Sequence, residues 1–280
     1  MDTTRPFIEV KDITQAFGDQ HVLCGVSFDL YKGELLVLIG GSGAGKSVIL
    51  KHLVGLLDPI SGQVVVDGQP MSDVPEARKA PLRAKIGFMF QQGALFDSMS
   101  VFENVAFPLI ERGIKDPAVV KEKVEAALAA VELVGHGDKM PANLSGGMIK
   151  RVAVARAMVS APECLLYDEP TAGLDPVVSD SVSYMIRRIC VESGIATLVV
   201  THDMSSVIHI ADRVIFLDQG RVHWEGSPLD LVHSEDPLIK RFVSGNSGED
   251  WSSVHNAPRP DFQSQLVSDA LKQRYQQHSN

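Results

Sequence analysis

The sequence contains few cysteines, and their spacing is uninformative. Its 280 residues include three, Cys24, Cys164 and Cys190, which are widely scattered. They match neither a disulfide framework nor a cysteine-based metal site, and such sparse thiols are typical of a protein from a reducing cytosol. We therefore expect all three to be small core side chains.

Positive charge and long apolar runs are also scarce. The formal net charge is −9, with 26 Lys and Arg against 35 Asp and Glu. This argues against a large basic face, so we expect no nucleic acid partner. No apolar stretch approaches the ~18 residues needed to cross a bilayer, and residues 1–6 lack the apolar core of a signal peptide. We expect a cytoplasmic protein that acts on a membrane only through a partner.

A complete phosphate-binding loop, G-x-x-x-x-G-K-S, is present. It consists of Gly40, Gly41, Ser42, Gly43, Ala44, Gly45, Lys46 and Ser47. An apolar, strand-like run precedes it and a helix-like run follows, which is the context this motif requires. Its backbone N–H groups and the helix N-terminus form an anion site. Lys46 can reach the β- and γ-phosphates and Ser47 can bind magnesium, so the sequence predicts a nucleotide-binding protein.

Strand-like and helix-like segments alternate along the chain. This predicts an α/β fold with a largely parallel sheet covered by helices. The strand-like runs are 7–10, 26–30, 35–39, 64–66, 86–90, 164–167, 197–200 and 214–217. Between about 102 and 159 the periodicity is helical, most plainly at Val120, Val124, Ala127, Leu128 and Val131. We expect a helical insertion at about 95–160 within a domain spanning 1–245.

Residues 246–280 form a C-terminal tail that begins within a Ser- and Gly-rich linker at 244–250. Two alternatives stay open for it. The tail is disordered in isolation, or a helix with the apolar stripe Phe262, Leu266, Val267 and Leu271 docks on a partner or on a second copy.

Two acidic residues end an apolar strand at 164–169. Asp168 can supply a hard oxygen ligand to magnesium on a triphosphate, and Glu169 can orient and polarise the attacking water. A solvated strand end is the plainer alternative, but the presence of a phosphate loop in the same chain favours the metal-binding and catalytic roles.

A second anion site is indicated at Ser145, Gly146 and Gly147, which open a helix. An ordinary serine N-cap is the alternative. Leu144 and these three residues form a Leu-Ser-Gly-Gly sequence between a phosphate loop and an acidic strand end. This arrangement resembles the signature motif of ABC-type ATPases, and the resemblance covers about residues 7–243.

The resemblance implies roles for four further residues. Phe17 would stack on adenine, and Gln91 would touch magnesium or water and sense the membrane partner. Asp175, in the D-loop, would cross to the opposite subunit, and His202 would contact the γ-phosphate. Three of them have plainer alternatives: core packing for Phe17, a surface amide for Gln91, and a structural or surface histidine for His202.

The resemblance also implies a fold and an assembly. The fold is that of a P-loop NTPase, with a mainly parallel sheet core, an antiparallel β subdomain and an inserted helical subdomain. The assembly is a head-to-tail homodimer that holds ATP and Mg²⁺ between residues 40–47 of one copy and 145–147 of the other. Catalysis would fall to Lys46, Gln91, Glu169 and His202, and metal binding to Ser47, Gln91 and Asp168.

Met148 stands where the family's signature usually ends in glutamine, which leaves the Ser-Gly-Gly anion site intact. A Met-ended signature and the segment 90–109 resemble the Mla-type branch, whose ATPases drive phospholipid movement between the two membranes of diderm bacteria. The implied partners are a permease dimer in the inner membrane, a substrate-binding membrane-anchored protein and, optionally, a small STAS-domain protein. The chain would then lie at the cytoplasmic face of the inner membrane.

Two other functions remain open. One is the ATPase of a small-solute importer, for example of amino acids. The other is a non-transport ABC ATPase acting on ribosomes or DNA, which the single phosphate loop, the single signature and the lack of a long heptad run disfavour.

Overall fold

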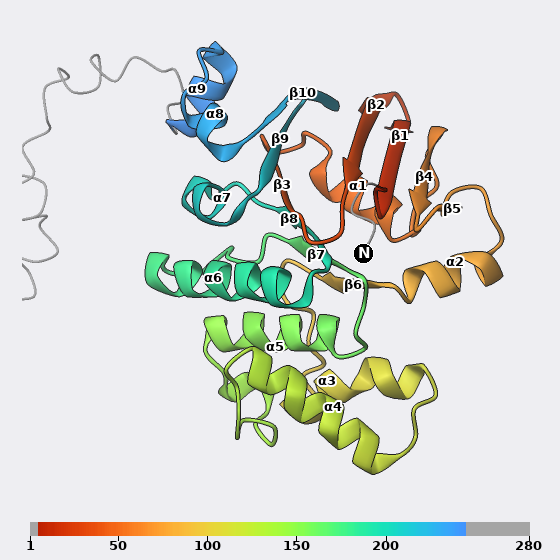
Figure 1. Cartoon of the computed structure of the whole chain (residues 1–280), viewed down its shortest axis with the longest axis vertical. Coiled ribbons are helices and arrows are strands. Elements are labelled where there is room, and N and C mark those ends of the chain that lie inside the picture. The colour runs from red at the N-terminus through yellow and green to blue at the C-terminus, as the bar shows by residue number, and fades with distance from the viewer. Residues whose placement is uncertain (1–4, 245–280) are drawn as a thin grey trace, which may run out of the picture. The chain divides into compact units, whose positions relative to one another are not determined.

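The computed structural model describes residues 5–244, which form two β-sheets and their covering helices (Figure 1). The tail that the sequence singles out, 246–280, lies outside the described residues. No helix within residues 5–244 has both the length and the apolar character to span a bilayer.

The larger sheet has six strands in the spatial order β10-β9-β3-β8-β7-β6. The neighbours from β9 to β6 are parallel, and the edge strand β10 is antiparallel to β9. Its strands are β3 (Leu35–Gly40), β6 (Ile86–Met89), β7 (Cys164–Asp168), β8 (Ala196–Val200), β9 (Arg213–Asp218) and β10 (Arg221–Gly226). The predicted α/β class with a largely parallel sheet is confirmed.

Strand β3 is buried along its whole length because both faces of the sheet are covered. Leu35, Val37 and Ile39 belong to the core shared with the helices, whereas Leu36 and Leu38 belong to the core shared with the smaller sheet. The continuous apolar run before the phosphate loop therefore follows from the position of β3 between two cores.

The smaller sheet is antiparallel, with the order β2-β1-β4-β5. Its strands are β1 (Ile8–Phe17), β2 (Gln20–Leu30), β4 (Ser61–Val66) and β5 (Gln69–Pro70). The first two are longer than the sequence predicts. Their added parts, 11–17 and 20–25, alternate buried side chains such as Ile13 and Leu23 with exposed polar ones, so they contain no continuous apolar run. Cys24 on β2 is only partly buried, unlike Cys164 and Cys190, so the expectation of three core cysteines is wrong for this residue.

Helices of the main sheet domain lie before β6 and after β7. They are α1 (Lys46–Leu53), α2 (Glu76–Arg83), α6 (Pro176–Ser193), α7 (Met204–Ile210), α8 (Pro228–Val232) and α9 (Pro237–Val243). The sequence pattern does not single out α2, because its mean composition is polar and Pro81 lies inside it.

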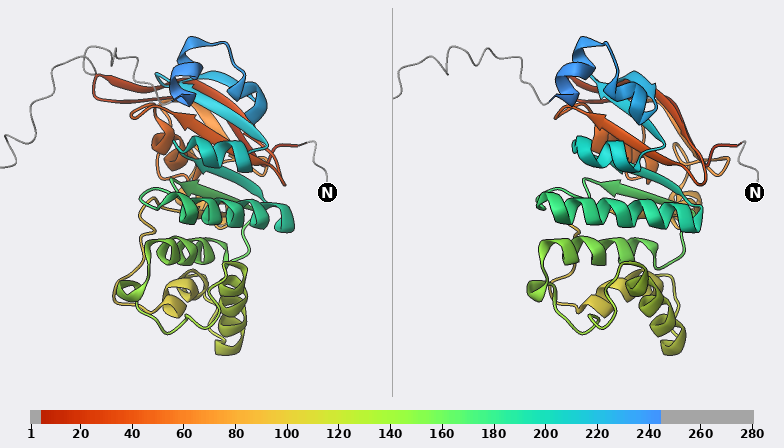
Figure 2. Two further views of the ribbon diagram at one scale, coloured as in Figure 1. Left: turned by 90° about the vertical axis from the view of Figure 1, so that its left-hand side faces the viewer. Right: turned by 60° about the vertical axis from the view of Figure 1, so that its left-hand side comes forward.

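Three further helices lie between β6 and β7: α3 (Val101–Glu111), α4 (Pro117–Ala130) and α5 (Gly146–Met158), with a 3₁₀ turn at Pro141–Asn143. They gather at the end of the molecule opposite the antiparallel sheet (Figures 1 and 2). Ser100 and Glu103 form a capping box at the start of α3. All five apolar positions predicted to share a face between 120 and 131 are buried.

Candidate nucleotide site

The candidate residues lie at one edge of the larger sheet. Parallel strands end together, and β3, β6, β7 and β8 each end at this edge, with Val200 of β8 opposite both Leu38 of β3 and Asp168 of β7. The phosphate loop, Gln91, Glu169 and His202 follow these strands directly. Open α/β sheets bind their ligands at this edge, outside the carboxyl ends of the strands.

The glycines of the phosphate loop have steric reasons to be glycine. A Cβ on Gly40 would lie 2.2 Å from the carbonyl oxygen of Leu217, and one on Gly45 would lie 2.6 Å from Leu23 Cδ2. Gly45 has φ +104° and begins α1 without a side-chain cap. The first N–H groups of α1 therefore have no side-chain acceptor from the cap residue and can bind an anion.

Lys46 is held against its own loop. Its ammonium donates hydrogen bonds to the carbonyl oxygens of Gly40 at 2.8 Å and Gly41 at 3.0 Å. Burial lowers the pKa of Lys46, while the negative charges of Glu169 and Asp168 oppose that effect. The ammonium thus lies within the field of both carboxylates, at the place where phosphate charge would bind.

Ser47, in the first turn of α1, and Asp168, at the end of β7, come together. A hydrogen bond from the Ser47 hydroxyl and the charge of Lys46 favour the ionised form of Asp168, but burial and the neighbouring Glu169 outweigh them and raise the pKa of Asp168. Residues 5–244 contain no cluster of three or more His, Cys, Asp or Glu side chains suited to a metal. One hydroxyl and one carboxylate are enough for Mg²⁺ that binds together with nucleotide phosphates, since Mg²⁺ usually takes few protein ligands.

The side chains of Glu169 and His202 are hydrogen-bonded to each other. Nδ1 of His202 lies 2.9 Å from Oε1 of Glu169, and the Glu169 side chain is 12% exposed against 68% for His202. Glu169 also has φ +49°, an unusual left-handed conformation for this residue. Such outliers gather at functional sites.

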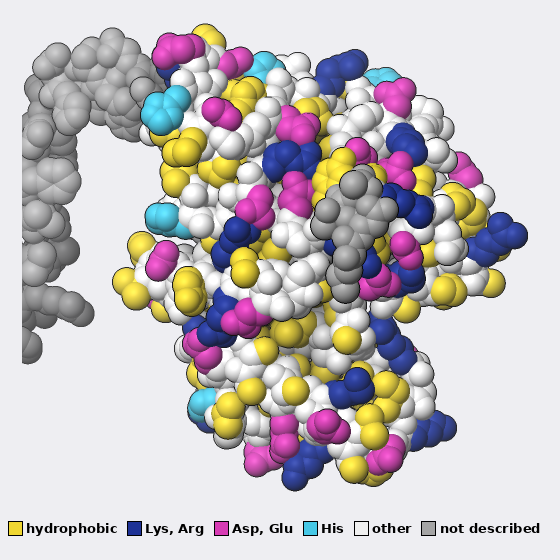
Figure 3. All heavy atoms as spheres, in the orientation of Figure 1, with side chains coloured by type: hydrophobic (Ala, Val, Ile, Leu, Met, Phe, Trp, Pro, Cys, Tyr) yellow, Lys and Arg dark blue, Asp and Glu magenta, His cyan; other side chains and the backbone are white. Residues whose placement is uncertain are grey.

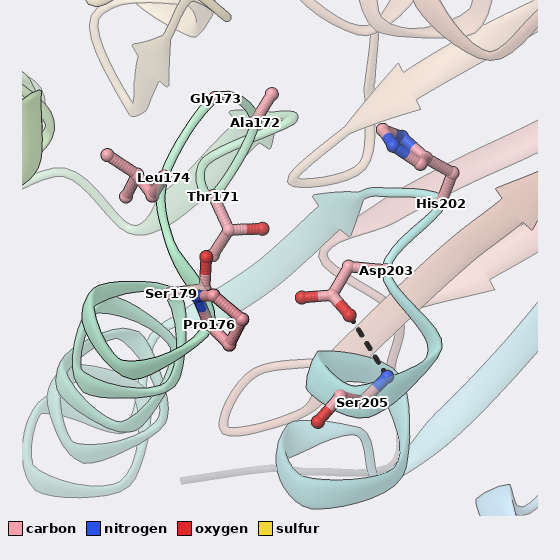
Figure 4. Close-up of a pocket in the computed structure, with 9 residues that line it drawn as sticks. All are labelled: Thr171, Ala172, Gly173, Leu174, Pro176, Ser179, His202, Asp203 and Ser205. Atoms are coloured by element: carbon pink, nitrogen blue, oxygen red, sulfur yellow. Dashed lines mark hydrogen bonds between the residues drawn. The ribbon is translucent and has the colours of Figure 1, made fainter. Parts of the chain in front are cut away.

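A cavity of about 440 Å³ opens beside His202. Figure 4 shows residues 171–174 on one side of it and His202 with Asp203 on the other. Asp203 caps α7 by accepting from Ser205 N at 3.1 Å. Ala172, Gly173 and Leu174 of the D-loop line this cavity, so the D-loop lies beside His202.

Asp175 and the signature residues lie at helix starts. Asp175 caps α6 by accepting from the backbone N–H groups of Val177 and Val178. Ser145 caps α5, accepting from Met148 N at 3.3 Å. A Cβ on Gly147 would lie 2.5 Å from Val178 Cγ1, so the signature helix packs closely on α6.

The two remaining predicted residues are exposed. Phe17, at the end of β1, is 51% exposed, which excludes core packing as its role in this chain. The Gln91 side chain is exposed too, but its backbone oxygen accepts a hydrogen bond from Lys150. Lys150 is a site residue that the sequence reasoning missed, because a lysine in a helix is usually solvated; its position two residues after the signature was the available signal.

A phosphate loop at the end of a parallel strand, facing two carboxylates and a histidine on neighbouring strands, defines a P-loop nucleotide-binding protein. The profile of the ABC transporter family matches residues 23–172. The chain belongs to this family and is an ATPase whose hydrolysis is coupled to transport. Cassettes of this family bind ATP, form dimers and associate with membrane permeases.

Its relatives carry different transport names. "Protein TRIGALACTOSYLDIACYLGLYCEROL 3, chloroplastic" of Arabidopsis thaliana is 42% identical, covering 85% of this chain and 74% of the relative. The sulfate/thiosulfate import ATP-binding protein CysA of Caulobacter vibrioides is 42% identical, with coverages of 86% and 70%. The intermembrane phospholipid transport system ATP-binding protein MlaF of Haemophilus influenzae is 35% identical, with coverages of 86% and 91%.

Solved cassettes share the fold. A dimeric ATP-binding cassette in a post-hydrolysis state, bound to ADP and Pi, superposes with a TM-score of 0.72 at 31% identity. The match covers 79% of this chain and 98% of the solved one. The mixed fold with a P-loop core is therefore that of an ABC ATPase.

Proposed function

We propose that this ATPase powers phospholipid movement between an inner and an outer membrane, as the peripheral subunit of an Mla-type complex. The resemblance of residues 90–109 to that branch carries the proposal. The intermembrane phospholipid relative supports it, since its match spans 91% of that protein, and the chloroplast relative bears the name of a glycerolipid.

A groove at the same segment suits a membrane partner. It has a volume of about 480 Å³, and four phenylalanines line it in two ring pairs, Phe88 with Phe90 and Phe96 with Phe107. Phe90 is 46% and Phe96 41% exposed. Exposed aromatic rings in a groove favour docking of an apolar helical segment, and we assign this one to a cytoplasmic helix of the permease.

We assign the catalytic roles from the resemblance to ABC-type ATPases, and the site geometry supports them. Lys46 and the loop N–H groups would hold the phosphates, Ser47, Asp168 and Gln91 would hold magnesium, and Phe17 would stack on adenine. Bound magnesium supplies neutralising charge on the phosphates. Glu169 would orient and deprotonate the attacking water, and its bond to His202 fixes the carboxylate.

The site would be completed by a second copy. Ser145, Gly146 and Gly147 of one subunit would face the phosphate loop of the other, with Asp175 near the crossing point. The remaining partners are a permease dimer, a substrate-binding membrane-anchored protein and a small STAS-domain protein, at the cytoplasmic face of the inner membrane. Positive and negative side chains are interspersed on the face shown in Figure 3.

Purification of the full chain from its native membranes tests the substrate. We expect a permease and a membrane-anchored substrate-binding protein to co-purify, with phospholipid enriched over a matched preparation in which Phe90 and Phe96 are replaced by serine. Recovery of a periplasmic solute-binding protein without lipid enrichment would contradict the proposal. That outcome would favour the second candidate, a small-solute importer, which the sulfate/thiosulfate relative supports.

A further inference from the structure

Lys150 is a buried lysine of α5 to which no catalytic role has been given above. It is 6% exposed, and its ammonium donates to the backbone oxygens of Gln91 and, at 3.3 Å, Glu169. Burial lowers the pKa of Lys150, against the opposing charges of Glu169 and Asp168. Burying a charged group costs free energy unless the group is hydrogen-bonded, and these two hydrogen bonds offset that cost for the Lys150 ammonium.

The hydrogen bond to Glu169 O holds the backbone of that residue. This residue has φ +49°, a conformation that costs about 1–3 kcal/mol and persists only when its surroundings impose it. Its N–H donates to Val200 O at 2.8 Å, and its oxygen accepts from Ala172 N at 3.2 Å as well as from Lys150. Lys150 is the side-chain donor in this set, and it comes from the signature helix.

The hydrogen bond to Gln91 O holds the loop after β6. Lys150 donates to Gln91 O, and Arg156 on the same helix donates to Gly93 O at 2.6 Å and Ala94 O at 2.7 Å. Two cations of α5 thus hold this loop. Lys150 differs from Arg156 because its ammonium also reaches the Glu169 backbone.

We propose that Lys150 is a positioning residue for ATP hydrolysis: it fixes Glu169 from the backbone side and joins it to the Gln91 loop. The inference rests on the proposed role of Glu169 as the base. A misplacement of about 1 Å at a reacting centre can cost about 10²-fold in rate. The phosphate loop makes no hydrogen bond to Lys150 in this arrangement, so kcat rather than the KM for ATP should respond.

The test uses the full chain with Lys150→Met, which keeps the aliphatic stem and removes the donor. We expect kcat to fall at least about tenfold, and the KM for ATP to change less than about threefold. Lys150→Arg, which keeps a cationic donor, should recover part of the rate. If Lys150→Met does not fold, Lys150→Leu, which also lacks a donor, carries the same measurements.

A matched control is Lys79→Met. Lys79 is 7% exposed and bonds Asp58, outside the site. The Lys79→Met substitution should lower the melting temperature without lowering kcat. Amide hydrogen exchange adds a readout of position: Lys150→Met should speed exchange at both 91–94 and 169–172, and Lys79→Met at neither.

A double variant separates this inference from the role of Glu169. If Lys150 acts through the carboxylate, adding Lys150→Met to Glu169→Gln should lower the residual rate by less than about twofold. Wild-type kcat in Lys150→Met, or a full multiplicative loss in the double variant, would overturn the inference. Normal turnover in Glu169→Gln alone would instead overturn the assignment of the base.

Discussion

Nδ1 of His202 lies 2.9 Å from Oε1 of Glu169, a contact that joins the loops after the neighbouring strands β8 and β7. Two residues from separate motifs therefore share one hydrogen bond at the carboxyl edge of the sheet. Residues coupled in this way should act as a unit, so the effects of replacing them should not be additive.

Glu169→Gln should lower steady-state ATP hydrolysis by at least about 10²-fold, the usual contribution of a positioned base. ATP binding should persist, because Lys46 and the loop N–H groups are untouched. Phosphate release and the binding of a fluorescent ATP analogue measure the two quantities. His202→Ala should also slow hydrolysis, yet add little when combined with Glu169→Gln; full additivity would show that the pair does not act together.

Asp168→Asn should separate stability from activity. Burial and Glu169 raise the pKa of Asp168, so its ionisation destabilises the folded chain increasingly above the ordinary pKa of an aspartate, and fully above the raised pKa. Replacement should therefore raise the melting temperature at pH 7. The gain in the free energy of unfolding should be less than about 1 kcal/mol, because the group is half-exposed and screened. The gain should shrink as the pH falls through the raised pKa, while Mg²⁺-dependent hydrolysis is lost at every pH. A stabilisation that grows toward acid pH would contradict the assignment.

Phe17→Ala should weaken ATP binding by about tenfold, since stacking of a base on an aromatic ring is worth about 1–3 kcal/mol. Because the ring is 51% exposed, its removal leaves no core cavity and the melting temperature should hardly change. Phe17→Tyr should bind ATP normally. Unchanged affinity in Phe17→Ala would remove this residue from the site.

Gly147→Ala should push α5 away from α6. The new Cβ would lie 2.5 Å from Val178 Cγ1, and overpacking of this kind costs about 1–3 kcal/mol. Adding Val178→Ala removes the opposing methyl and should restore most of the lost stability, as followed by denaturant unfolding. A double variant no more stable than Gly147→Ala would place the strain elsewhere.

The sequence predicts the parts of the site whose chemistry is local. A phosphate loop needs glycines at fixed positions, and an acidic strand end suits magnesium, so residues 40–47, Asp168 and Glu169 could be proposed without coordinates. His202 was proposed only through the resemblance to ABC-type ATPases. The apolar face of α4 and the parallel sheet follow from periodicity in the same way.

Features that depend on packing between distant segments could not be predicted. Lys150 is a charged residue on a helix, and nothing local indicates that its ammonium is buried between the loops carrying Gln91 and Glu169. The left-handed conformation of Glu169 is likewise imposed by bonds to Val200, Ala172 and Lys150. Helix α2 is polar and contains Pro81, so periodicity gives no signal for it.

The central claim is that two copies complete each other's ATP site. In a Cys24→Ser, Glu169→Gln background, one chain carries Ser42→Cys and another carries Ser145→Cys; both serines are exposed, whereas Cys164 and Cys190 are buried. The two proteins are mixed, mildly oxidised with or without ATP and Mg²⁺, and resolved on a non-reducing gel. We predict a disulfide-linked dimer of the two chains that forms with ATP and is scarce with ADP. Absence of this dimer while ATP is bound, or equal yields with and without nucleotide, would contradict a head-to-tail site.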